Sequence, residues 1–110
     1  MDSPERLFAP VDIEALYQRR RTERHKLDGK PADLALPSGT VVAIVREISV
    51  SGFMAECAEP VAIGSIVSLE IPGIGRVDAQ IRWQMGFRMG GMFVDPISLK
   101  ECAWMAARPA

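Results

Sequence analysis

The sequence has little of what most enzyme and metal sites need. It contains one histidine, His25, and two cysteines, Cys57 and Cys102, which lie far apart along the chain. Zinc sites and disulfide frameworks need more of these residues at closer spacings, so we expect neither. A nucleophile with its base, paired carboxylates and a P-loop are likewise not recognisable. We therefore expect a binding protein without catalytic residues, metal or cofactor.

Long apolar runs are also missing. No run approaches the about 20 apolar residues that a membrane-spanning helix needs. Residues 1–6 lack the basic region and apolar stretch of a secretory signal. We therefore expect a cytoplasmic protein that does not insert into a membrane.

Charge of one sign is scarce, because 13 basic and 14 acidic side chains leave a net charge of −1. Surfaces that bind nucleic acid are usually basic overall, and those that bind single strands also need aromatic platforms. Aromatic residues make up only 6% of this chain. We expect no nucleic-acid partner, and a small barrel that binds single strands through arginines is the least favoured alternative.

What the sequence does contain is a series of short β-type patterns separated by turn residues. A chain of 110 residues is near the commonest domain size, so one domain is expected. Six runs alternate in polarity or are rich in β-branched residues: residues 32–36, 41–48, 53–57, 65–71, 76–85 and 88–94. Turn signals at this spacing predict an all-β barrel or sandwich.

The clearest of these runs, residues 76–85, predicts one face for its apolar members: Val77, Ala79, Ile81 and Trp83. Two glycine-rich spots, Gly73 with Gly75 and Gly90 with Gly91, lack the lysine and helix that phosphate-binding loops require. We interpret both as hairpin turns.

Two short helices are expected at the ends of the chain. Residues 10–20 begin with proline and end with arginines, which suits a short amphipathic helix. Residues 98–107 predict a C-terminal helix with Ser98 as its N-cap and Glu101 completing a capping box. Its packing face would consist of Leu99, Cys102, Ala103 and Ala106.

Nearly half of the basic side chains lie in one short stretch: Arg19, Arg20, Arg21, Arg24, Lys26 and Lys30. An arginine fork can bind phosphate oxygens or the O6/N7 edge of guanine, and it can stack on a flat base. A charge run is more often only a solvated surface. The cluster alone therefore leaves both interpretations open.

A second polar segment, residues 47–52, lies at a break between two predicted strands. Glu47 and Ser49 are two residues apart, so their side chains would share one side of the strand end. Gly52 would permit a tight turn with positive φ. A carboxylate can accept hydrogen bonds from guanine and a hydroxyl can bind phosphate or base, but an ordinary hairpin is the simpler interpretation of this segment alone.

Together the two segments resemble the PilZ family of bacterial receptors for cyclic di-GMP. That family carries two arginines separated by three residues, often after a further arginine, and later the pattern Asp/Asn-x-Ser-x-x-Gly. Arg20 and Arg24, preceded by Arg19, match the first motif, and residues 47–52 match the second except for its first position. The run from Trp83 to a Gly-x-x-Phe ending is similar to the family's last two strands.

The resemblance implies a six-stranded antiparallel β-barrel with short N-terminal and C-terminal helices and an arginine arm across its outer face. We expect residues 1–18 to form a mobile segment with a candidate short helix, 19–97 the barrel domain with its arm, and 98–110 a helix and tail. The implied ligand residues are Arg19, Arg20, Arg24, Glu47, Ser49 and Gly52. Arg20 and Arg24 would clamp cyclic di-GMP, Arg19 would assist, and the ordered arm would signal to an unidentified downstream protein.

One residue departs from the family pattern. Glu47 occupies the position where the family has Asp or Asn, and its carboxylate extends one methylene further. Losing a bidentate contact to guanine is worth ~1–3 kcal/mol. An alternative function is therefore a PilZ-like adapter that works by protein contact and has lost or weakened its nucleotide binding.

Overall fold

The six alternating segments form six strands in the computed structural model, which describes residues 23–106. The strands are β1 (His25–Leu36), β2 (Gly39–Ile48), β3 (Gly52–Glu56), β4 (Ile66–Ile71), β5 (Gly75–Met85) and β6 (Arg88–Phe93). All six predicted strands are confirmed. β1 begins earlier than its alternating run, because a bulge between Lys26 and Lys30 lets the strand continue back to His25.

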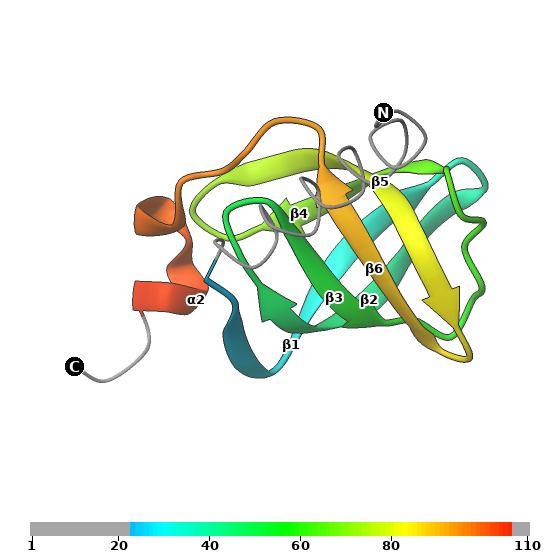
Figure 1. The fold of residues 1–110 in the computed structure, drawn as a ribbon, viewed down its shortest axis with the longest axis horizontal. Helices are drawn as coiled ribbons and strands as arrows, with labels where there is room; N and C mark the ends of the chain where they lie inside the picture. The colour runs from blue at the N-terminus through cyan, green and yellow to red at the C-terminus, as the bar shows by residue number, and fades with distance from the viewer. Residues whose placement is uncertain (1–22, 107–110) are drawn as a thin grey trace, which may run out of the picture.

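The strands close into an antiparallel barrel in the order β1-β2-β3-β6-β5-β4. Figure 1 shows β3, β6 and β5 side by side on its near wall. The barrel closes where β1 meets β4, through the pairs Leu34–Leu69 and Ala35–Ser68. The six-stranded antiparallel barrel is thereby confirmed.

Alternate residues of the strands point into the barrel and form its core. The largest fully buried side chains are Leu34, Val45, Ile48, Val67, Leu69, Ile71, Ile81, Met89 and Cys102. Burial of this apolar surface is the main force that holds the barrel together. Polar and charged side chains of the same strands are left on the outer wall, where a ligand can reach them.

Of the two glycine-rich spots, only one is a hairpin turn. Gly73 and Gly75 have φ values of 91° and 102°, and they join β4 to β5 as predicted. Gly90 and Gly91 lie inside β6 and are buried, so their assignment to a turn is wrong. The β5–β6 turn instead contains Gly86, whose φ is 61°.

The predicted continuous C-terminal helix is also wrong. A 3₁₀ turn, η1 (Leu99–Glu101), is followed by Cys102 in an extended conformation and by the short α2 (Ala103–Ala106). Ser98 makes no side-chain capping hydrogen bond. The Ala103 N–H instead donates to the Pro72 carbonyl at 2.8 Å.

Tertiary contacts explain the break in this segment. Cys102 and Trp104 are buried, whereas Ala103 is exposed, so the packing face differs from the predicted one. Burying these two side chains at the end of the barrel, where Figure 1 shows α2, outweighs the local preference for one helix. The other predicted helix, residues 10–20, lies outside the described residues. Between residues 23 and 106, no helix has the length and hydropathy to cross a membrane.

Candidate ligand-binding site

Strand pairing brings the two sequence motifs together. His25 pairs with Ile48 across β1 and β2, and Lys26 pairs with Glu47. The chain before His25 therefore runs beside the residue that follows Ile48. This register places Arg24 next to the turn that begins at Ser49.

A pocket of about 240 Å³ opens on the outer wall beside this turn. Its lining comes from the arm and from β2, β3, β5 and β6: Arg24, Glu47, Ile48, Ser49, Ser51, Gly52, Phe53, Met54, Arg82, Trp83, Arg88, Gly90, Gly91 and Met92. The lining includes each sequence-predicted site residue that the structure describes. Arg19 and Arg20 lie outside the described residues.

A bulge in β2 turns Glu47 toward this wall. Val45 pairs with Ala55 and Glu47 pairs with Met54, so Arg46 is an extra residue in β2. In a regular strand without this bulge, the Glu47 side chain would point into the barrel like that of Val45, which is buried. The bulge therefore places both Arg46 and Glu47 outside the core.

Ser49 shapes the turn between β2 and β3. Among the polar and charged side chains of residues 23–106, that of Ser49 is the buried one. Its Oγ accepts hydrogen bonds from the N–H groups of Ser51 (3.2 Å) and Gly52 (3.1 Å). The same Oγ lies 3.3 Å from the Gly52 carbonyl, to which it can donate. The hydroxyl thus holds the backbone of this turn in place, and a direct ligand contact by Ser49 stays a prediction.

Gly52 is required for a reason other than the predicted positive φ. It is not among the glycines with positive φ. A Cβ at this position would instead collide with the carbonyl oxygen of Gly91 on the neighbouring strand β6. Close approach of two backbones therefore demands glycine here.

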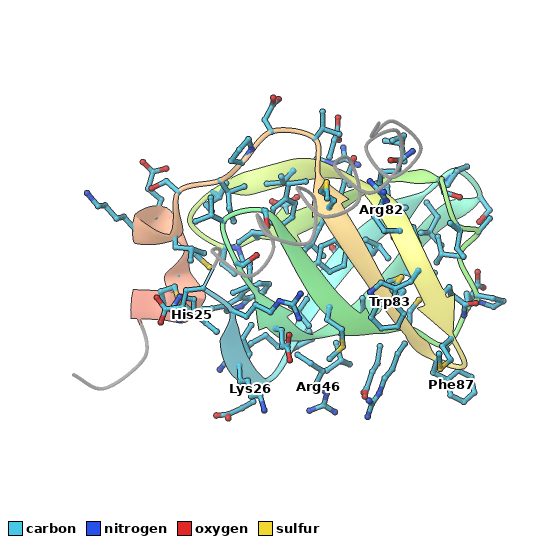
Figure 2. The ribbon with its side chains drawn as sticks, viewed as in Figure 1. His25, Lys26, Arg46, Arg82, Trp83 and Phe87 are labelled. Carbon is cyan, nitrogen blue, oxygen red and sulfur yellow. The ribbon has the colours of Figure 1, made fainter. Side chains whose placement is uncertain are left out.

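A second bulge brings Arg82 and Trp83 to the pocket, and the sequence pattern missed both. Ile81 pairs with Gly91 and Trp83 with Gly90, so Arg82 is the extra residue in β5. The alternation had placed Trp83 on the same face as Ile81, and this is wrong. Figure 2 shows Arg82 and Trp83 on β5, and Trp83 is 38% exposed.

Glycine at position 90 makes room for the indole. A Cβ there would overlap the Trp83 ring, so the ring lies against the bare backbone of β6. The guanidinium of Arg82 lies beside Met92, with 3.9 Å between Nη1 and the sulfur. The resemblance of this region to the family's last strands was the only sequence signal for these residues.

An ion-pair network borders the pocket on β3. Glu56 Oε1 accepts hydrogen bonds from Arg46 Nε (3.2 Å) and Nη2 (3.1 Å). Glu56 Oε2 lies 3.5 Å from Arg88 Nε. Arg88 lines the pocket, whereas Arg46 and Glu56 do not.

The pocket combines positive charge with a flat apolar floor. Three arginines (Arg24, Arg82 and Arg88) and one glutamate (Glu47) line it, together with glycines, methionines and aromatic rings. Such a surface suits an anion that also carries a flat ring. Among the side chains of residues 23–106, no group of three or more His, Cys, Asp or Glu is placed to hold a metal ion.

A closed six-stranded barrel with a cationic pocket on its outer wall has the architecture of a small ligand-binding domain. The family model of the PilZ domain matches residues 18–106, and the chain belongs to this family. PilZ domains are binding and adaptor domains, and they are generally receptors for cyclic di-GMP. The resemblance seen in the sequence is thus confirmed. Comparison with curated proteins gave no match.

Proposed function

We propose that this protein is a cytoplasmic bacterial sensor that binds cyclic di-GMP and passes the signal to a partner protein. The observation that carries the proposal is the meeting of Arg24, Glu47, Ser49 and Gly52 around one pocket, although the first is far from the others in sequence. Between residues 23 and 106, every residue that matches one of the family's two motifs lines this pocket.

The chemistry of the lining fits each part of a cyclic dinucleotide. Arg24, Arg82 and Arg88 offer donors for the two phosphates and for the O6/N7 edge of guanine. Glu47 offers an acceptor for the guanine N1 and N2 donors. The Trp83 ring and the glycine backbone beside it offer a flat surface for a base.

The size of the pocket gives the arm a role. Its volume of about 240 Å³ is below the roughly 300–1,000 Å³ of typical small-molecule sites. A cyclic dinucleotide would therefore extend beyond it, and Arg19 and Arg20 would hold the remaining part. Ligand binding would then order the arm against the barrel and create a surface for the downstream partner.

Isothermal titration of the full chain with cyclic di-GMP tests the proposal. We expect saturable heat at micromolar ligand, because several charge-assisted hydrogen bonds form at once. GTP is the matched control ligand, since it carries one guanine and more charge, and it should bind at least about tenfold more weakly. The absence of heat at several hundred micromolar cyclic di-GMP, with a folded sample, contradicts the proposal.

Glu47 favours one alternative, an adapter with degenerate nucleotide binding. The Glu47→Asp variant separates the two functions, because aspartate restores the side chain of the family pattern. If Glu47 is suited to its outward position on the β2 bulge, the affinity changes by less than about threefold. A gain of tenfold or more, within the ~1–3 kcal/mol of one bidentate contact, indicates the degenerate adapter. Titration of both proteins with cyclic di-GMP makes the comparison.

A further inference from the structure

Glu56 occupies a central position among the arginines next to the pocket. It lies on β3, where its neighbours across the sheet are Ile44 on β2 and Arg88 on β6. Its side chain is 29% exposed, and it reaches one arginine from each neighbouring strand. Figure 2 shows Arg46, the arginine from β2, extending outward from the barrel.

The two arginines are held unequally. Arg46 donates two hydrogen bonds to Oε1. The Arg88 Nε, by contrast, lies 3.5 Å from Oε2, and no hydrogen bond links these two residues. The Arg88 side chain is also the more exposed, at 64% against 43% for Arg46. Arg46 is therefore fixed by Glu56, while Arg88 is attracted to it without being locked in place.

We propose that Glu56 is an internal counter-anion for Arg88, with which an anionic ligand must compete. Arg88 lines the pocket and also lies beside Glu56, which is outside the pocket lining. A phosphate that binds Arg88 would therefore leave Glu56 paired with Arg46 alone. Glu56 thereby lowers the affinity of the pocket for anions. The identity of the natural ligand in this inference rests on the proposed function; the competition for Arg88 does not.

The Glu56→Gln variant tests the competition. Glutamine keeps an oxygen that accepts from Arg46, but it removes the charge that attracts Arg88. We expect cyclic di-GMP to bind about two- to fivefold more tightly, as the modest strength of exposed ion pairs implies. The gain should shrink at high salt, where such pairs are screened.

Two further variants make the test specific. In an Arg88→Ala background the Glu56→Gln change should bring no gain, since there is no arginine left to release. The matched control is Glu70→Gln on β4, which removes the same charge from an exposed strand position on the opposite wall of the barrel. It should leave the affinity unchanged.

Inorganic pyrophosphate, titrated into the same variants and followed by NMR shifts of the arginine Nε–H groups, separates this inference from the proposed function. Tighter pyrophosphate binding by Glu56→Gln that depends on Arg88 supports the inference, even if cyclic di-GMP binds to none of the proteins. Equal or weaker binding by Glu56→Gln overturns it, because Glu56 would then position Arg88 instead of competing for it. A gain that persists without Arg88 also overturns it, as a general charge effect.

Discussion

Replacing Arg24 with alanine is expected to weaken cyclic di-GMP binding by about 10- to 100-fold. Arg24 is exposed and lines the pocket beside the Ser49 turn. Hydrogen bonds to charged groups contribute about 1.5–3 kcal/mol each, which corresponds to a loss of this size. Isothermal titration of the variant measures it, and the melting temperature should stay within about 2 °C because no core contact is lost.

Arg76→Ala provides the matched control for Arg24. Arg76 is also an exposed arginine, but it lies at the start of β5 opposite Glu70 and does not line the pocket. Its removal changes net charge equally, so it reports the purely long-range electrostatic effect. We expect less than a twofold change in affinity. Equal losses in the two variants would mean that Arg24 acts only through its charge at a distance.

Substituting Gly52 with alanine is expected to destabilise the fold by about 2–3 kcal/mol, the upper part of the range for overpacking a closely packed site. The added Cβ would collide with the Gly91 carbonyl oxygen. This atom belongs to the backbone of β6, so β3 and β6 would have to separate to relieve the clash. A thermal melt followed by circular dichroism should show a fall of about 10 °C in the melting temperature.

The Val50→Ala variant shows whether this effect is specific to the close approach. Val50 lies in the same turn and is 40% exposed. Its truncation should change the stability by no more than about 0.5 kcal/mol. Similar melting temperatures for the two variants would contradict the backbone contact that we assign to Gly52.

The strands were predictable because the signal that defines them is local. In β4 and β5, apolar side chains recur at every second residue, and this period matches the pleat of a strand with one buried face. Gly73 and Gly75 mark the turn between them for an equally local reason, since each has a positive φ. Barrel closure had a weaker signal and followed mainly from the family resemblance.

The candidate site was predictable only in part. Arg24, Glu47, Ser49 and Gly52 were found through motif order, and the structure brings them around one pocket. Arg82, Trp83 and Arg88 were missed, although they line the same pocket. Strict alternation places Trp83 on the same face as the buried Ile81. No pattern in residues 76–85 indicates that Arg82 is an extra, bulged residue.

The sequence alone was thus sufficient for the six strands, their turns in most cases, and membership of the PilZ family. Only the tertiary structure decided which way the side chains of Glu47 and Trp83 point and why position 52 requires glycine. It also decided that the C-terminal helical segment is interrupted at Cys102. The physical reason is the range of the interactions. Polarity period and turn conformation depend on adjacent residues, whereas bulges, backbone contacts and docking of the C-terminal segment depend on strands that are distant in sequence.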